Sequence, residues 1–252
     1  MTDSDVSSET ARRSPDRRAA PAGTGAPAPE GYSLWFVLIA AIFVTTLITS
    51  NIIAVKLVDV AGLVVPAATV TIFPLSYLLG DILTEVYGFS RARQIIWLGF
   101  LCNLMAVAAI YATQLLPAPG FWDAQVAYER ILGFAPRLLA GSFAAYLVGE
   151  FANAYVLARM KVLTNGRWLW SRTISSTLIG EGIDSLVFIS IAFAGTITGH
   201  QLLRTMATAW LFKSGYEVLA TPLTYLVVNF LKRSEGVDVF DRQTDFSPVR
   251  FS

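Results

Sequence analysis

Six apolar stretches, each long enough to cross a lipid bilayer, dominate this sequence. They cover about residues 33–58, 62–85, 94–116, 138–158, 174–198 and 203–231. A hydrocarbon core about 30 Å thick requires roughly 20 apolar residues in a helix. Lipid also excludes open sheets and loops, because each backbone polar group needs a partner within the protein. The pattern therefore predicts an all-α integral membrane protein with six transmembrane helices.

The two ends of the chain differ in composition from the apolar part. Residues 1–31 are rich in Ala, Pro, Ser and charged side chains, a composition that cannot bury enough apolar surface to fold, so we expect a disordered tail. The first apolar stretch is too long for the core of a cleavable signal peptide, and we expect it to be retained as a helix. Residues 32–233 then form the transmembrane domain, and residues 234–252 form a second tail.

The distribution of Lys and Arg predicts the orientation of the chain. Short loops and tails that carry these residues remain in the cytoplasm. With the N-terminus inside, the opposite side keeps only Arg130, Arg137 and Arg204, whereas the cytoplasmic loops and tails hold most of the remaining Lys and Arg. Both termini are therefore predicted to be cytoplasmic, which agrees with an even number of helices.

Charged side chains occur within the apolar stretches, where lipid disfavours them. They include Asp81, Glu85, Glu150, Glu181, Asp184, Lys213 and Glu217. A charge at the centre of a bilayer costs at least about 2.5 kcal/mol, so such groups face a protein interior or a wet cavity and mark substrate or proton paths. This feature favours a transporter.

Helical spacing places several of these groups in pairs. Glu181 and Asp184 share a face of the fifth stretch, as do Glu150 and Asn153 on the fourth, and Lys213 and Glu217 on the sixth. Three helices thus each present a polar pair near mid-depth, as a central pocket requires. The excess of acids suits proton coupling or a ligand rich in hydrogen-bond donors, such as the planar edge of guanine, and disfavours an anionic substrate.

Structural roles for the same residues remain open from sequence. Lys213 and Glu217 can form an ion pair that holds the sixth helix in register. Glu85 lies near the cytoplasmic end of its stretch, where it can be solvated and pair with Arg91 or Arg93. Asn51, Asn103 and Gln114 are candidates for hydrogen bonds between helices.

Several classes of protein are disfavoured by what the sequence contains. It has no Gly-rich phosphate-binding loop, so an ATPase within the chain is not expected. The single cysteine, Cys102, can build neither an internal disulfide nor a Cys-based zinc site, and we expect no metal or cofactor. The net charge of +1 indicates no nucleic-acid partner. An intramembrane hydrolase would need a matched pair of aspartates or several histidines, so we expect no catalytic residues and no enzyme activity.

Four runs of residues resemble one known family. They are GDILTEVYG from Gly80, GEFANAYVLARMK from Gly149, RTISSTLIGEGIDSLVFISIAFAG from Arg172 and KSGYEVLATPLTYLVV from Lys213. These runs look like the queuosine precursor transporters of the vitamin uptake transporter family, and the resemblance extends over about residues 33–241.

The resemblance implies a six-helix protein of the cell inner membrane. Its substrate would be 7-cyano-7-deazaguanine or 7-aminomethyl-7-deazaguanine, imported for salvage into the tRNA nucleoside queuosine. The residues that it suggests for substrate contact are Asp81, Glu85, Glu150, Asn153, Glu181, Asp184, Lys213, Tyr216 and Glu217. The source of energy, a homo-oligomeric state and an energising partner stay open. A substrate-binding subunit of a multi-component uptake system is the alternative to a self-sufficient secondary transporter.

Overall fold

The computed structural model describes residues 31–60, 63–133, 136–193, 195 and 198–249. The expected disordered tail therefore lies almost entirely outside the described residues. Within these ranges the chain forms eight helices and one β-hairpin. Their bounds are α1 Leu34–Ile53, β1 Leu57–Val60, β2 Leu63–Pro66, α2 Ala67–Thr71, α3 Phe73–Tyr87, α4 Phe89–Gln114, α5 Gln125–Leu132, α6 Pro136–Leu163, α7 Leu169–Phe193 and α8 Gly199–Glu235.

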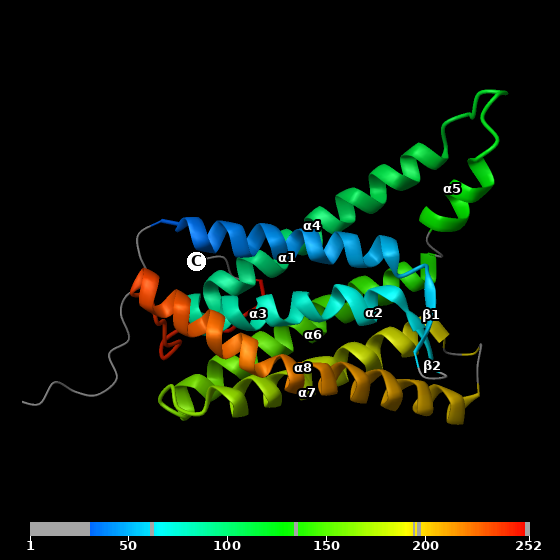
Figure 1. Cartoon of the computed structure of the whole chain (residues 1–252). Coiled ribbons are helices and arrows are strands. Elements are labelled where there is room, and N and C mark those ends of the chain that lie inside the picture. Colours follow the sequence, from blue (N-terminus) through cyan, green and yellow to red (C-terminus); the bar gives the residue numbers. More distant parts are fainter. Residues whose placement is uncertain (1–30, 61–62, 134–135, 194, 196–197, 250–252) are drawn as a thin grey trace, which may run out of the picture.

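Three of the described helices are long and apolar enough to cross a membrane, namely α1, α4 and α7. The other predicted stretches fall on α3, α6 and α8. Successive long helices run in opposite directions, so that α3, α6 and α8 end where α1, α4 and α7 begin (Figure 1). We call this end of the bundle the basic end, because Arg93, Lys161, Arg172 and Lys232 lie near it.

The structure corrects the all-helical expectation at one place. Residues 57–60 and 63–66 pair as an antiparallel hairpin, with Leu57 opposite Pro66 and Val60 opposite Leu63. This segment is rich in valine, whose β-branched side chain favours strands. The second predicted span is consequently a shorter helix that begins at Phe73, and the long loop between Leu116 and Arg137 contains the additional helix α5.

Helices α6 and α7 pack closely through two glycines. A Cβ atom at Gly149 would lie 2.8 Å from the Cβ of Asp184, and one at Gly180 would lie 2.7 Å from the Cβ of Asn153. Small residues allow membrane helices to approach at backbone distance. This contact brings the polar pair of α6, Glu150 and Asn153, against the acids of α7. Aromatic and aliphatic side chains of α1 and α3, including Phe43, form the adjacent apolar core.

Candidate functional site

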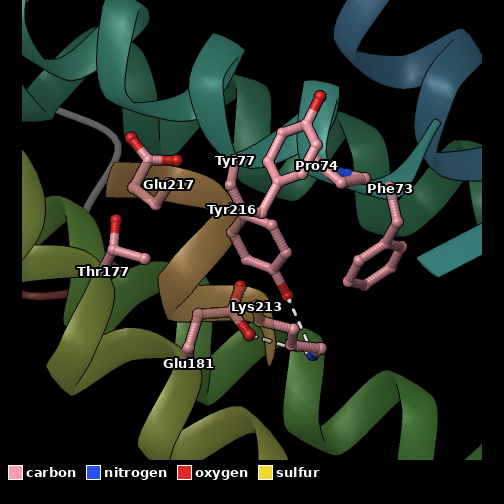
Figure 2. A pocket seen from close by; sticks show the side chains of 8 residues that line it. All are labelled: Phe73, Pro74, Tyr77, Thr177, Glu181, Lys213, Tyr216 and Glu217. Carbon is pink, nitrogen blue, oxygen red and sulfur yellow. Dashed lines mark hydrogen bonds and ion pairs between the residues drawn. The ribbon is translucent and has the colours of Figure 1, made fainter. Parts of the chain in front are cut away.

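A small pocket lies between α3, α7 and α8 (Figure 2). Its lining consists of Phe73, Pro74, Tyr77, Thr177, Glu181, Lys213, Tyr216 and Glu217. The free volume is about 10 Å³, which holds at most a single water molecule. The helices must therefore move apart before any larger ligand can enter.

Lys213 closes one side of this pocket. Its Nζ lies 2.5 Å from Asp184 Oδ2 and 2.9 Å from Glu181 Oε2, both on α7. The same ammonium lies 4.9 Å from the ring centre of Phe73 and 3.5 Å from the hydroxyl oxygen of Tyr77. Figure 2 shows Glu181, Lys213 and Tyr77 joined in this way. Two carboxylates and two aromatic rings thus surround one primary ammonium group.

The alternative pairing of Lys213 with Glu217 is not formed. Lys213 reaches across to α7, and the described residues offer no hydrogen-bond partner to the buried Glu217 Oε1. The hydroxyl of Thr177, on the same wall of the pocket, is also buried without a partner among the described residues. A buried polar atom without a partner carries a free-energy penalty of about 1–3 kcal/mol. These two groups are therefore suited to bind a ligand that restores their hydrogen bonds.

Glu150 faces a second small hollow on the other side of Tyr77. Phe73 and Tyr77 line both spaces and form the wall between them, whereas Asp184 lines the second hollow. Glu150 itself is 5% exposed and its carboxylate lies against Gly80 of α3. The aromatic rings of Phe73 and Tyr77 therefore separate Glu150 from Glu217.

Asp81 and Asn153 form a pair one helical turn further along α3. The Asn153 amide donates to Asp81 Oδ1 over 2.7 Å, while Asp81 Oδ2 has no hydrogen-bond partner among the described residues. Both side chains are buried. This bond joins α3 to α6 below the pocket, beside the close contact of Gly149 and Gly180.

Glu85 lies in a separate cluster at the basic end. Its Oε1 accepts from Arg172 Nη2 and Lys232 Nζ, each over 2.7 Å, and lies 3.7 Å from Lys161 Nζ. The side chain has no exposed surface. The alternative of a solvated Glu85 paired with Arg91 or Arg93 is therefore wrong, since burial between α3, α6, α7 and α8 gives it other cations.

The structure thus distributes the nine predicted site residues over several places. Glu181, Lys213, Tyr216 and Glu217 line the pocket, and Asp184 holds Lys213 there. Glu150 occupies the neighbouring hollow, Asp81 and Asn153 form their own pair, and Glu85 belongs to the basic end. The hypothesis of hydrogen bonds between helices is confirmed for Asn51 and Asn103, with Asn51 Nδ2 donating to Asn103 Oδ1 over 3.0 Å. It is not confirmed for Gln114, whose Nε2 has no hydrogen-bond partner among the described residues.

Sequence reasoning missed Phe73, Tyr77 and Thr177. A periodic signal for two of them was present, because Tyr77 precedes Asp81 by four residues and Thr177 precedes Glu181 by four residues. Residues at this spacing share a helix face. Phe73 offered no such signal, since its role depends on the packing of α3 against the ammonium of Lys213.

The arrangement can bind a flat, donor-rich cation or neutral molecule. Aromatic rings at Phe73, Tyr77 and Tyr216 offer stacking surfaces, and the carboxylate of Glu217 offers acceptors for N–H groups. Glu181 and Asp184 already hold an alkylammonium group, that of Lys213. A group of this kind in a ligand would fit the same acids.

Comparisons with known proteins identify the family of this chain. Residues 67–227 match the family described as "Putative vitamin uptake transporter". The chain is 28% identical over 190 residues to the "Probable queuosine precursor transporter" of Bacillus subtilis (strain 168), covering 75% of this chain and 82% of that protein. It is 31% identical over 121 residues to the "Queuosine precursor transporter" of Escherichia coli (strain K12), covering 48% of this chain and 52% of that protein. No solved structure significantly matches the chain.

The family match extends over more than half of the chain and includes α3, α4, α6, α7 and most of α8, which together build the pocket and the clusters beside it. Three described helices have the length and composition of membrane spans. The chain is a membrane protein and belongs to the vitamin uptake transporter family.

Proposed function

We propose that this protein imports queuosine precursors across the cell inner membrane. The substrate is 7-cyano-7-deazaguanine or 7-aminomethyl-7-deazaguanine, destined for salvage into tRNA queuosine. The observation that carries this proposal is the pocket, where Glu217 and Thr177 present buried polar atoms without described partners between aromatic rings. The names of the relatives in Bacillus subtilis and Escherichia coli support the same substrate class.

A deazaguanine matches the chemistry of the pocket group by group. Its ring N–H and exocyclic amino group lie on one edge and can donate two parallel hydrogen bonds to a carboxylate, for which Glu217 is suited. The flat ring system can stack on Tyr77 or Tyr216. In the aminomethyl compound, the side-chain ammonium resembles that of Lys213 and can bind to Glu181 and Asp184.

The proposed topology has six spans with both termini in the cytoplasm. The three spans beyond α1, α4 and α7 are α3, α6 and α8, which alternate in direction with them (Figure 1). Asp81 and Glu85 on α3 and Lys213 and Lys232 on α8 contact polar or charged groups of other helices in the bundle, as a membrane favours. The basic end, which carries Arg172, Lys161 and Lys232, then faces the cytoplasm in accord with the positive-inside rule.

For secondary transport we propose protons as the coupling ion. Glu150 and Asp81 are buried acids that no described ion pair neutralises, and they lie beside the pocket rather than within its lining. Buried carboxyl groups of this kind serve as proton relays in transporters. Their position lets substrate and proton occupy adjacent places.

The test is uptake of radiolabelled deazaguanine by liposomes that contain only this chain. An inward proton gradient should accelerate uptake in the wild-type protein. Glu217→Gln should abolish it, whereas Glu129→Gln on the exposed helix α5 should have no effect. Binding without uptake would instead favour a substrate-binding subunit that needs an energising partner, and the absence of both binding and uptake would overturn the proposal.

A further inference from the structure

The chain folds back across the basic end after α8. Gly236, with φ of 66°, adopts the left-handed conformation that commonly ends a helix. Residues 237–249, which we call the C-terminal strap, then run over the ends of α3, α4 and α6 at the basic end of the bundle (Figure 1). Val237 and Asp241 within the strap are each 2% exposed. This segment is therefore packed on the bundle.

The first half of the strap binds the junction between α3 and α4. The backbone N–H of Val239 donates to the Val86 carbonyl over 3.2 Å. Asp241 Oδ2 accepts the backbone N–H of Phe89 over 3.0 Å, which caps the start of α4. An acidic side chain at this position also interacts favourably with the helix dipole.

The second half of the strap binds along α4 and α6. Arg93 donates to the carbonyl oxygens of Asp245 and Ser247 over 3.0 and 2.7 Å, and Trp97 Nε1 donates to that of Pro248 over 2.8 Å. The ring of Phe246 contacts the ring of Phe89 on α4, with 5.0 Å between their centres. It also contacts Tyr155 on α6 at 5.1 Å.

The strap also completes the ionic cluster around Glu85. Asp238 lies 2.6 Å from Lys161 Nζ and 2.9 Å from Lys232 Nζ, and the Val239 carbonyl accepts from Lys161 over 2.7 Å. Lys161 and Lys232 are thus shared between the buried Glu85 and a residue of the strap, while Arg172 pairs with Glu85. Without Asp238, the three positive charges of the cluster would be balanced only by the single negative charge of Glu85.

This cluster lies between the pocket and the basic end. On α3, Glu85 follows the pocket residue Tyr77 by eight residues, which is about 12 Å along a helix. On α7, Arg172 lies nearer to the basic end than Glu181 does. On α8, Lys232 likewise lies nearer to the basic end than Glu217 does. Three helices therefore place the cluster on the path that a ligand would take from the pocket to this end.

We propose that the Glu85 cluster is the inner gate of the transport path and that the C-terminal strap is its latch. The strap ties the ends of α3, α4, α6 and α8 together, so these ends cannot separate while its contacts persist. The strap is suited to release because its ion pairs lie at the periphery of the bundle. The Asp238 side chain is 37% exposed, whereas the side chain of Glu85 beneath it is buried. Short peripheral segments open at lower free energy than packed helices. This inference rests on transport through the bundle but not on the identity of the substrate.

The test measures access to a position behind the gate. Ser176 on α7 has no exposed surface and lies one turn from Arg172 toward the pocket. Ser176→Cys in a Cys102→Ser background provides a single thiol for a membrane-impermeant maleimide applied to inside-out vesicles. With the strap intact we expect slow labelling. In the double variant Asp238→Asn/Phe246→Ala we expect labelling at least tenfold faster.

A second readout follows the strap itself in the same vesicles. Trypsin cleavage after Arg242 should accelerate with labelling, because both report release of the strap. Asp123→Asn, in the exposed loop before α5, is the matched control and should change neither rate. Monodisperse elution of each purified variant establishes that it is folded.

Each result decides the proposal without the use of any substrate. Faster cleavage together with faster labelling supports it. Faster cleavage with unchanged labelling would show that the strap does not latch the path. If neither rate changes, the contacts of Asp238 and Phe246 do not hold the strap, and the proposal is equally overturned.

Discussion

Lys213 on α8 lies 2.5 Å from Asp184 on α7, whereas Glu217, one turn along its own helix, keeps a buried carboxylate oxygen without a described partner. The cation thus neutralises the acids of the neighbouring helix and leaves one acceptor in the pocket. The two helices are held together by an interaction that a ligand with its own ammonium group could replace.

Removing the charge of Glu217 should impair binding more than folding. Glu217→Gln keeps the shape of the side chain but weakens two charge-assisted hydrogen bonds to a donor-rich ligand, each worth about 1.5–3 kcal/mol. We expect the Kd for a deazaguanine to rise at least tenfold, as measured by titration calorimetry in detergent. The melting temperature should stay within a few degrees of wild type. An unchanged Kd would exclude Glu217 from the site.

Replacing Lys213 should change the preference between the two precursors. Lys213→Met leaves Glu181 and Asp184 without their cation, so these acids should favour the aminomethyl compound over the neutral cyano compound. We expect the ratio of the two Kd values to shift by about tenfold, which corresponds to about 1.4 kcal/mol. Lys213→Arg, which keeps the charge, is the control. An unchanged ratio would mean that neither acid contacts the ligand's side chain.

The close contact of α6 and α7 should not tolerate a methyl group. In Gly180→Ala the new Cβ would meet the Asn153 Cβ at 2.7 Å, which forces the helices apart and strains the bond from Asn153 to Asp81. Overpacking of this kind costs about 1–3 kcal/mol, measured as a lower melting temperature. Gly215→Ala on α8 is the matched control, because no atom lies within 4 Å of its added Cβ. Equal melting temperatures for the two variants would contradict the contact.

The Glu85 cluster should behave as a single coupled unit. Glu85→Gln leaves Arg172 and two lysines at the basic end with one carboxylate fewer, and breaking a buried pair in this way costs about 3–5 kcal/mol. Arg172→Gln should also destabilise the protein. The double variant should lose much less than the sum of the two losses. Additive losses in a double-mutant cycle from thermal unfolding would show that the two groups do not interact.

Acid should weaken the ion pairs by which Asp238 holds the strap on the bundle. Burial by itself would raise the pKa of Asp238, but the ammonium groups of Lys161 and Lys232 outweigh this effect and lower the pKa below its ordinary value. A carboxyl group with a lowered pKa in the folded state contributes stability above its unfolded pKa, about 3.9, and loses it as the pH falls through the folded pKa. Trypsin cannot follow this change at low pH, so pepsin cleavage of the strap is the measurement.

In the wild-type protein, pepsin cleavage within residues 237–249 should accelerate as the pH falls from about 5 to below 3. Asp238→Asn should be cleaved rapidly throughout that range, because its side chain carries no charge to lose. If the variant and the wild-type protein show the same pH profile, Asp238 does not hold the strap through its ion pairs.

The pattern of apolar and charged residues along the sequence predicts where the helices lie and that their charged groups are buried. The apolar stretches predicted the bounds of α1, α4, α6, α7 and α8 to within about five residues, because a bilayer-spanning helix needs a long apolar run. The same reasoning failed at residues 57–60 and 63–66, where a hairpin replaces the end of one predicted span and the start of another. Short valine-rich runs are compatible with either a strand or a helix, and only pairing with a neighbour decides between them.

By itself, the sequence determined which residues lie within the apolar helices and which of them are charged. Only the tertiary structure decided the partners: Lys213 with Asp184 rather than Glu217, Glu85 with Arg172 rather than Arg93, and Asp241 with the start of α4. The reason is that helical spacing relates residues only within one helix. Ion pairs between helices depend on how close the helices pack and on the direction in which long side chains reach, and neither is encoded in local periodicity.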